Sequence, residues 1–470
     1  MTLHRDKTPE SSGITHKSKS PMTLWAVFFW LVIWQIAGMI INDNIFFVTP
    51  LEVLQRLSQL VLQGSLWLSI GYSFTRIIAG FFLAAAIGTL MAIVSSRSKQ
   101  VESLLAPLIL VIKSVPVVSF IILALIIFTS RNLSILISFM MGLPVFYSNV
   151  LQGIRSMDPK LDEMATVFRI SDALRLRDIA MPQIYPYFEA AVSTAAGLCW
   201  KAGAAAEVIG IPDGSIGENL QRAKVYLETA DLFAWTIVIV ICSLLLEKLS
   251  LLATKRVATA LERIPKNQTG GAKREQTDAG DITINDLVKT YGSLKVLKDF
   301  SAVIPNGAVT AVMAPSGVGK TTLLRILAGL EEADSGHVSG LENRKISYVF
   351  QEDRLLESFD AVTNVRIVRP ELSDEEVKTA LAAVGLRENA CIINEYSGGM
   401  KRRVTIVRAL MADWDVLFMD EPFRGLDEIS RKLAIDYTSQ LLKGRTCVLV
   451  THDPDEPQLM GAESIITLKV

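Results

Sequence analysis

The chain has 470 residues, of which 50% are hydrophobic and 20% are charged. This is too apolar for a soluble enzyme and not apolar enough for a protein lying wholly in a membrane, so a membrane domain joined to a water-soluble domain is indicated. The 47 basic residues balance 48 acidic ones, which argues against nucleic acid as a partner, because proteins that bind it carry a basic excess. The 4 cysteines include no CxxC pair. Neither a disulfide framework nor a zinc site is therefore predicted, and the soluble part is expected in a reducing cytosol.

The first half of the chain carries the apolar segments. Residues 1–21 are polar and basic, and we predict a cytosolic tail. A helix that spans the hydrocarbon of a bilayer needs about 20 apolar residues, and we predict that residues 22–255 form an all-α transmembrane domain with six such helices. The candidate spans are Met22–Ile41, Ile77–Val94, Ser114–Thr129, Leu133–Leu151, Tyr187–Ile209 and Leu232–Leu246. Basic residues gather on the side that holds both ends of this domain, so the positive-inside rule predicts that this side is the cytosol.

Two features stand out inside these segments. Small residues recur four apart at Gly80, Ala84 and Gly88, a spacing that predicts close packing of a neighbouring helix. Lys201 and Glu207 are ionisable residues within the fifth span. Such residues are candidates for lining a transport path. Alternatively, Lys201 extends its long side chain to the outer interface, and both interpretations stand at this point.

The composition changes after the last apolar segment. Residues 256–280 are polar and contain Gly-Gly, so a flexible linker is predicted. From there to residue 470, short β-branched runs alternate with helical patterns. This alternation predicts an α/β domain over residues 281–470.

A phosphate-binding loop follows the predicted strand Val309–Met313. The sequence Ala314-Pro-Ser-Gly-Val-Gly-Lys-Thr-Thr precedes a helical pattern, and strand, glycine-bearing loop, Lys-Thr and helix is the context that such a loop requires. The loop N–H groups and the helix N-terminus are suited to phosphate. The residues expected to bind nucleotide here are Ser316, Gly317, Gly319, Lys320, Thr321 and Thr322. Lys320 is expected to reach the β- and γ-phosphates and the Thr321 hydroxyl to ligate magnesium. Ala314 stands where the usual pattern begins with glycine.

An acidic pair follows a second apolar strand, Val416–Met419. Asp420 at the carboxyl end of a strand is suited to magnesium, directly or through water. Glu421 beside it is suited to polarising an attacking water molecule. Taken alone, an acidic pair after a strand is as often a solvated strand end, but the upstream phosphate loop favours a site.

Further motifs surround these two. They are Phe350-Gln-Glu, Tyr396-Ser-Gly-Gly-Met-Lys, Gly425-Leu-Asp and Thr451-His-Asp. Together and in this order, residues 281–470 resemble the nucleotide-binding domain of ATP-binding cassette (ABC) proteins, a domain of the phosphate-loop NTPase class. The resemblance implies that ATP and Mg²⁺ are the cofactors.

The same resemblance implies residue roles. Tyr291 is similar to the aromatic residue that stacks on adenine, and Gln351 to the glutamine that contacts magnesium and senses the membrane domain. His452 resembles the histidine at the γ-phosphate. Lys320, Gln351, Glu421 and His452 would then form the catalytic set, and Thr321, Gln351 and Asp420 the magnesium set.

The signature loop of the family resembles residues 396–400. Ser397, Gly398 and Gly399 would contact the γ-phosphate of ATP held by another subunit, and Asp427 resembles the aspartate that follows the acidic pair. Tyr396 and Met400 differ from the common outer residues of this loop.

The membrane half contains a second resemblance. Glu163-Met-Ala165, with Pro182 further on, is similar to the loop of bacterial ABC importers that docks on the ATPase, although Arg169 stands where that loop usually has glycine. Most of residues 22–255 resemble permeases of the nitrate, sulfonate, taurine and thiamine-precursor import group. The resemblance therefore implies a permease fused to its ATPase.

We expect a half-transporter that works with a second copy of itself, imports a small polar or anionic solute, and receives it from an extracytoplasmic solute-binding protein. Its expected location is the bacterial cytoplasmic membrane, with the ATPase in the cytosol. One alternative is an ABC exporter half, which the short loop at Ser95–Glu102 disfavours. Another is a non-transporting ABC module that moves a membrane partner, which the loop around Glu163 disfavours.

Overall fold

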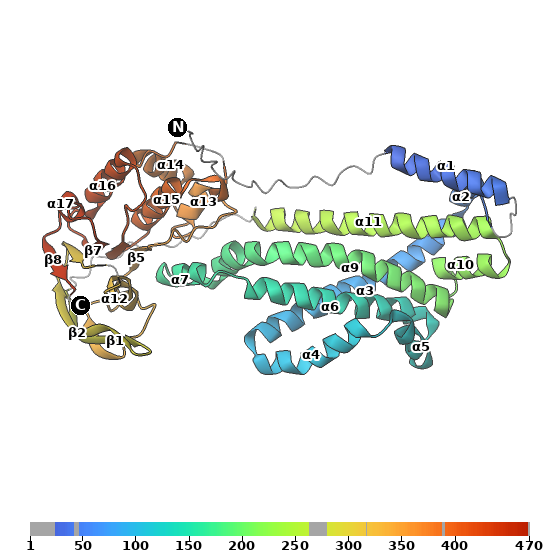
Figure 1. The fold of residues 1–470 in the computed structure, drawn as a ribbon, viewed down its shortest axis with the longest axis horizontal. Coiled ribbons are helices and arrows are strands. Elements are labelled where there is room, and N and C mark those ends of the chain that lie inside the picture. Colours follow the sequence, from blue (N-terminus) through green and yellow to red (C-terminus); the bar gives the residue numbers. More distant parts are fainter. Residues whose placement is uncertain (1–23, 42–46, 263–279, 316, 388–390, 469–470) are drawn as a thin grey trace, which may run out of the picture. The chain divides into compact units, whose positions relative to one another are not determined.

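The computed structural model describes all residues except 1–23, 42–46, 263–279, 316, 388–390 and 469–470. The predicted tail and most of the predicted linker therefore lie outside the described residues. The chain forms two compact units: the first comprises the residues up to Leu151 and Glu189–Thr254, and the second comprises Gln152–Phe188 and Lys255–Val470. This division differs from the sequence division because the segment 152–188 packs with the second unit (Figure 1).

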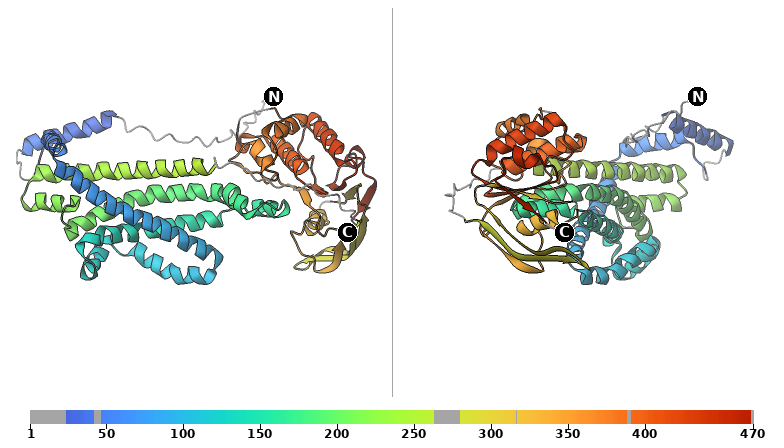
Figure 2. Two further views of the ribbon diagram at one scale, coloured as in Figure 1. Left: turned by 180° about the vertical axis from the view of Figure 1, so that it is seen from behind. Right: turned by 60° about the vertical axis from the view of Figure 1, so that its left-hand side comes forward.

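In the described part of the first unit, every regular element is a helix. The helices are α1 (Leu24–Ile41), α2 (Pro50–Val61), α3 (Gly64–Arg97), α4 (Lys99–Ser114), α5 (Val117–Ile127), α6 (Ser130–Arg155), α9 (Met181–Gly210), α10 (Ile216–Val225) and α11 (Thr229–Glu262), of which α6, α9 and α11 continue past the boundary of the unit. The long helices lie side by side, with α3 crossing the others obliquely (Figures 1 and 2).

By length and apolar composition alone, fewer of the described helices qualify as membrane spans than the six predicted. Among the described residues, three helices are long and apolar enough to cross a membrane, namely α3, α6 and α11, the last over Thr229–Arg256. The pair α4 and α5, bent by 105°, is either a fourth span or a re-entrant segment. The described part of α1 is a shorter apolar helix, and α9 is not among the spans, since it carries Glu189, Lys201 and Glu207 and many small residues.

The predicted span Ser114–Thr129 is wrong in its form. The helix breaks before Pro116, and α5 is only 11 residues long. Proline lacks an N–H group and drives the preceding residue out of the helical region. Val115 accordingly has φ −80° and ψ 131°, an extended conformation.

The close approach predicted for Gly80 and Gly88 is confirmed. A Cβ atom on Gly80 would lie 2.4 Å from the carbonyl oxygen of Ile135, and one on Gly88 would lie 2.9 Å from Cβ of Phe146. Both neighbours belong to α6, so a side chain at either glycine would force α3 and α6 apart.

Glu207 lies in the packing between three helices of this unit and is fully buried. Its Oε2 accepts a hydrogen bond of 2.6 Å from the hydroxyl of Ser73 on α3, and that hydroxyl in turn accepts one of 3.0 Å from the N–H of Ile216 on α10. Lys201 is exposed on α9. The contacts of Glu207 are those of a side chain that ties helices together.

The second unit is built on two sheets. An antiparallel sheet has the strand order β2-β1-β4, and a parallel sheet has the order β5-β6-β7-β3-β8. The strands are β1 (Ile282–Tyr291), β2 (Leu294–Ile304), β3 (Val309–Met313), β4 (Ser335–Ser339), β5 (Ile346–Val349), β6 (Val416–Asp420), β7 (Thr446–Thr451) and β8 (Ser464–Thr467). The prediction of an α/β domain is confirmed.

Helices cover both faces of the parallel sheet. The helices from residue 320 onward are α12 (Lys320–Leu327), α13 (Ala361–Arg366), α14 (Asp374–Ala383), α15 (Gly398–Met411), α16 (Glu428–Leu442) and α17 (Glu456–Leu459), of which α13 and α14 pack with α15. Side chains alternate along the strands: Leu417 and Leu449 pack with α15 and α16, whereas Phe418 and Val450 pack in a core that includes α12.

The segment 152–188 joins that second core. It contains α7 (Pro159–Val167), α8 (Asp172–Leu174) and a π-helical turn at Arg175–Ala180. Met164 and Ala165 of α7 are 0% and 1% exposed and pack in the same cluster as Phe418 and Leu324. Apolar burial of this kind contributes about 25 cal/mol per Å², which explains why α7 packs as part of the second unit.

Candidate functional site

The phosphate loop connects β3 to α12 and depends on two glycines. Gly317 and Gly319 have φ values of 86° and 97°, in the left-handed region that residues with a side chain rarely adopt. A Cβ atom on Gly319 would also lie 2.5 Å from Cγ1 of Val296. Ala314 is not among the residues with positive φ, and it packs against the core. Its backbone conformation therefore makes no demand for glycine.

Lys320 begins α12 and is 7% exposed. Its ammonium group donates to the carbonyl oxygens of Ala314 and Pro315, the latter at 3.2 Å, and so lies across the loop. Thr321 follows it, and its hydroxyl lies close enough to the carboxyl of Asp420 to act on the pKa of that carboxyl. Thr322 is half-buried on the same helix. Ser316 lies outside the described residues.

Asp420 is the last residue of β6 and is 1% exposed. Burial raises the pKa of its carboxyl, and the nearby hydroxyl of Thr321 opposes that shift. One oxygen, Oδ2, is buried without a hydrogen-bond partner. Carboxylate and hydroxyl oxygens are ligands that Mg²⁺ prefers, so the unpaired oxygen beside Thr321 fits a magnesium ion.

Glu421 and His452 come together at the same edge of the sheet. They follow β6 and β7, which are parallel neighbours. Nδ1 of His452 lies 3.4 Å from Oε1 of Glu421, and the guanidinium of Arg424 donates to Oε2 at 3.2 Å. The side chain of His452 is 60% exposed and that of Glu421 is 11% exposed. A half-shielded carboxylate beside an exposed imidazole can accept a proton from a water molecule.

Tyr291 and Gln351 both lie at the ends of strands. Tyr291 ends β1, is 47% exposed and donates its hydroxyl to Glu331. Gln351 is exposed two residues after β5, the neighbour of β6 in the parallel sheet. Because the carboxyl ends of parallel strands meet at one edge, Gln351 shares that edge with Asp420 and Glu421.

The signature residues lie at the N-terminus of a helix. No described contact joins them to the nucleotide edge of the sheet. Ser397 is the N-cap of α15 and accepts a 3.4 Å hydrogen bond from the N–H of Met400. Ser397 and Gly398 are exposed, and a Cβ atom on Gly398 would meet nothing within 4 Å. An open helix N-terminus of this kind attracts anions. Asp427 likewise caps α16, accepting from the N–H of Ser430 at 3.0 Å.

The two unusual signature residues face inward. Tyr396 is 8% exposed within a cluster that includes Val404, and Met400 packs against that cluster. Their size is accommodated by the core beneath the loop, which leaves Ser397 and Gly398 at the surface.

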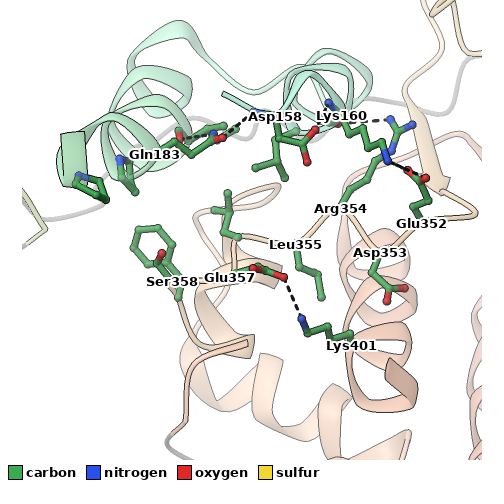
Figure 3. Close-up of a pocket in the computed structure, with 16 residues that line it drawn as sticks. Asp158, Lys160, Gln183, Glu352, Asp353, Arg354, Leu355, Glu357, Ser358 and Lys401 are labelled. Atoms are coloured by element: carbon green, nitrogen blue, oxygen red, sulfur yellow. Dashed lines mark hydrogen bonds and ion pairs between the residues drawn. The ribbon is translucent and has the colours of Figure 1, made fainter. Parts of the chain in front are cut away.

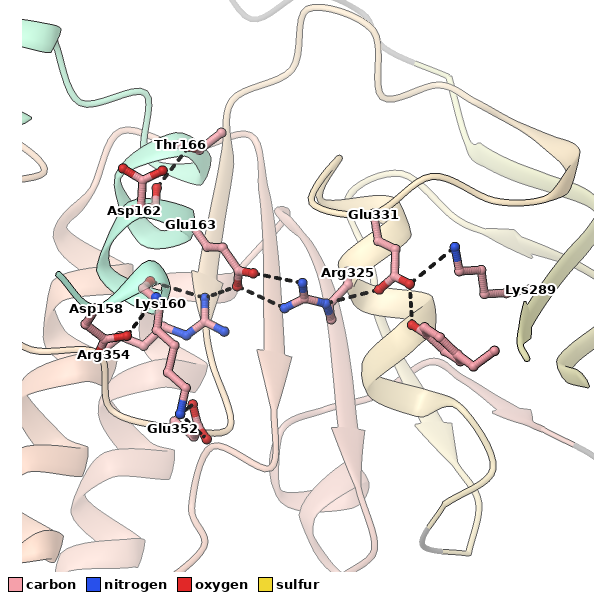
Figure 4. A network of polar contacts seen from close by, with 11 residues as sticks. Asp158, Lys160, Asp162, Glu163, Thr166, Lys289, Arg325, Glu331, Glu352 and Arg354 are labelled. Atoms are coloured by element: carbon pink, nitrogen blue, oxygen red, sulfur yellow. Dashed lines mark hydrogen bonds and ion pairs between the residues drawn. The ribbon is translucent and has the colours of Figure 1, made fainter. Parts of the chain in front are cut away.

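Glu163 of α7 forms a network of ion pairs that no motif predicted. Its carboxylate receives two hydrogen bonds of 2.9 Å from Arg325 on α12, and Arg354 lies 2.8 Å away (Figure 4). Hydrogen bonding from Arg325, together with the charge of Arg354, lowers the pKa of Glu163. Arg325 also contacts Glu331, which accepts from Tyr291. Helix patterns gave no signal for Arg325 or Glu331, since a charge in an amphipathic helix usually faces solvent.

A cavity of about 570 Å³ lies beside this network (Figure 3). Pro182 and Gln183 line one side, and Leu355 and Phe359 line the other. At its rim Lys160 pairs with Glu352, which follows Gln351 directly. The segment that carries Glu163 thus reaches the residues adjoining the predicted glutamine.

The backbone conformation at Arg169 is one that glycine adopts more easily than other residues. Its φ is 50°, in the left-handed region, at a cost of roughly 1–2 kcal/mol for a residue with a side chain. Its guanidinium donates to the carbonyl oxygen of Arg344 at 2.9 Å, which offsets part of that cost.

Fold and site together define a phosphate-loop nucleoside triphosphatase joined to a helical membrane domain. The family model of ABC transporters matches residues 297–424, and the model of the binding-protein-dependent transport system inner membrane component matches residues 84–263. The chain belongs to the ABC transporter family and joins a permease and its ATPase in one polypeptide. It is an ATP-binding ATPase that serves transport.

Three relatives match the ATPase half. The lipoprotein-releasing system ATP-binding protein LolD of Bacteroides thetaiotaomicron is 37% identical over 198 residues, which are 37% of this chain and 90% of that protein. The aliphatic sulfonates import ATP-binding protein SsuB 3 of Rhodococcus jostii is 36% identical, covering 41% and 72%. The intermembrane phospholipid transport system ATP-binding protein MlaF of Escherichia coli is 34% identical, covering 39% and 77%.

Proposed function

We propose that this chain is one half of an importer that uses ATP hydrolysis to take up a small polar or anionic solute, such as a sulfonate, taurine, nitrate or a thiamine precursor. The observation that carries the proposal is the match of residues 84–263 to the inner membrane component of binding-protein-dependent systems. A separate extracytoplasmic binding protein would deliver the solute. The relatives SsuB 3, LolD and MlaF match the ATPase half, so their different cargoes leave the choice of solute to the membrane half.

The proposed chemistry uses the edge formed by β3, β6 and β7. Lys320 and the N–H groups of the phosphate loop would hold the β- and γ-phosphates. Magnesium would be held by Asp420, Thr321 and Gln351, and would neutralise developing negative charge. Glu421 would accept the proton of the attacking water, while His452 would stabilise the γ-phosphate. The Thr321 hydroxyl near the Asp420 carboxyl and the unpaired Oδ2 of Asp420 support the magnesium assignment.

Two copies would form the working transporter. The exposed helix N-terminus at Ser397 and Gly398 is suited to the γ-phosphate of ATP bound in the other copy. Each ATP site would then be completed by the partner's signature loop, and closing the sites would move α7 and the membrane domain. The bidentate pair between Glu163 and Arg325 supports α7 as the element that transmits the movement.

Transport itself is the direct test. Right-side-out membrane vesicles containing the chain and its binding protein are supplied with radiolabelled taurine, nitrate or a thiamine precursor. We expect ATP-dependent accumulation of one of them that requires the binding protein, with ATPase domains on the cytosolic side. An exporter half would instead fill inverted vesicles without the binding protein. A non-transporting module would fill neither.

Shared sites can be tested with mixed dimers. In a Glu421→Gln background, Lys320→Ala removes the phosphate clamp and Ser397→Arg blocks the signature. A mixed dimer, purified with two affinity tags, retains one intact combination and should trap about one ATP per dimer by this geometry. Each mutant homodimer should trap none. A mixed dimer that traps no ATP contradicts shared sites.

A further inference from the structure

Arg402 is a buried cation that the predicted motifs do not use. It lies in the second turn of α15, the helix opened by Ser397, and is 4% exposed. A guanidinium so far from water must find partners for its five N–H donors, because a buried charge without partners costs several kcal/mol. Its partners therefore show what it holds in place.

One set of partners is the chain at the end of β6. Nε donates to the carbonyl oxygen of Pro422 at 2.8 Å, and Nη2 donates to those of Asp420 at 3.0 Å and Glu421 at 2.6 Å. Three consecutive peptide carbonyls thus converge on one guanidinium. Such hydrogen bonds, with a charged donor, are stronger than those between neutral groups.

The second set lies after β5. Nη1 donates to the carbonyl oxygens of Phe350 at 2.5 Å and Gln351 at 3.3 Å, and Asp353 is 3.5 Å away. Arg402 therefore connects the segment with the predicted catalytic carboxylate to the segment with the predicted magnesium glutamine.

The backbone at Glu421 needs such support. Its φ is 46°, in the left-handed region, where a residue with a side chain is strained. Strained residues persist only where surrounding contacts hold them. Arg402 donates to the carbonyl oxygen of Glu421. In addition, the N–H of Glu421 donates to the carbonyl oxygen of Val450 on β7 at 2.9 Å, which holds the other side of the residue in place.

We propose that Arg402 is a positioning residue for hydrolysis: it holds Glu421 in its left-handed conformation, so that the carboxylate points to the attacking water. The inference rests on the proposed function, in which Glu421 is the base. Lysine cannot replace the guanidinium, because its single nitrogen cannot bind carbonyls on two segments in the plane of a fork.

Arg408 supplies a matched control. It lies on the same helix, is 1% exposed and donates to the carbonyls of Arg354 and Asp353 at 2.7 and 3.4 Å. None of its described contacts reaches residues 420–422. Replacing Arg408 therefore removes a buried cation of the same kind but leaves the contacts of Glu421 intact.

The test is steady-state ATPase activity of the full chain in lipid nanodiscs, with nucleotide binding and thermal melting measured alongside. We expect Arg402→Gln to lower kcat about a hundredfold with KM for ATP nearly unchanged, because a displacement of about 1 Å has that effect on a reacting group. Arg402→Lys should lower kcat about tenfold, since it keeps the charge but not the fork. Arg408→Gln should lower the melting temperature yet keep kcat within about twofold.

A double-mutant cycle separates positioning from general damage. In the Glu421→Gln background, Arg402→Gln should leave the residual single-turnover rate unchanged, because the carboxylate through which it acts is gone. Loss of that residual rate by the same factor as in the wild type overturns the inference, as does a normal kcat in Arg402→Gln. If Arg402→Gln does not fold, the same cycle with Arg402→Lys decides.

The cycle also distinguishes this inference from the proposed function. Near-normal hydrolysis by Glu421→Gln alone removes the base and overturns both. An inactive Glu421→Gln with a fully active Arg402→Gln overturns the inference alone.

Discussion

The nucleotide edge and the surface that receives α7 belong to one unit but are built in different ways. At the nucleotide edge, functional groups follow directly on strands β3, β6 and β7, so the parallel sheet itself brings Asp420, Glu421 and His452 together. At the α7 surface, Glu163 meets Arg325 across 162 positions of sequence. The strand order therefore positions the groups at the nucleotide edge, whereas side-chain ion pairs hold α7 on its surface.

The two regions also differ in what a single substitution removes. Loss of a group at the nucleotide edge removes chemistry that no neighbour supplies. Loss of Glu163 removes the shared partner of two arginines: the side chains of Glu163 and Arg325 are 31% and 25% exposed, and that of Arg354 is 8% exposed. The expected importance of Glu163 lies in orientation, and the following predictions test that difference.

The largest expected effect is at the nucleotide edge. Glu421→Gln should lower ATP hydrolysis by orders of magnitude while ATP still binds, because the phosphate and magnesium contacts survive but the water loses its base. Hydrolysis is measured by phosphate release and binding with a fluorescent ATP analogue. Near-normal hydrolysis would remove Glu421 from its role.

The next effect should fall on transport alone. In Glu163→Lys, the new lysine faces the cations Arg325 and Arg354, and the like charges repel. Solute uptake should therefore collapse while basal ATPase persists. Asp162→Lys is the matched control, since Asp162 pairs only with Arg175 of the same segment among the described contacts. Uptake in vesicles and ATPase in detergent are compared for both variants. Unchanged uptake in Glu163→Lys would contradict the coupling assignment, and recovery in Glu163→Lys with Arg325→Glu would sharpen it.

A smaller effect is expected at Arg169. Arg169→Gly relieves the left-handed strain but loses the hydrogen bond to Arg344, two changes of about 1 kcal/mol each with opposite sign. The melting temperature should shift by only a few degrees. A large loss of stability, measured by thermal unfolding, would mean that the guanidinium holds more than its one described acceptor.

The smallest effect is predicted for Ala314→Gly. The backbone there does not adopt the left-handed region, so ATP affinity should remain unchanged or increase slightly as the Cβ is removed. Titration with a fluorescent ATP analogue measures it. A clear loss of affinity would show that the loop is built around alanine.

The positions of the candidate site residues at strand ends and glycine turns were largely predictable, whereas their catalytic roles stay predictions. Gly317 and Gly319 predict a loop with left-handed backbone conformations, and the apolar run before Asp420 predicts a buried strand that ends at this residue. Arg402 was not predictable, because a second arginine beside Arg403 in a helical pattern is typical of a solvated face. Its role appears only when β5 and β6 are seen to lie side by side.

The membrane half was predictable in type but not in detail. Apolar runs locate its helices, yet Pro116 breaks the third predicted span through a local steric effect. The spacing of Gly80 and Gly88 predicted that another helix packs closely on α3, and that helix is α6. No comparable spacing marks Arg325 or Glu331, so their contacts could not be predicted.

The burial of Met164 and Ala165 among residues of the β-sheet core has a consequence for dissection of this protein. A fragment beginning at residue 281 would keep every nucleotide motif yet expose the apolar strip that α7 covers. Such a fragment should self-associate or precipitate. Supplying residues 152–188 as a separate peptide should restore its solubility, which would make the ATPase a folding unit assembled from two distant stretches of gene.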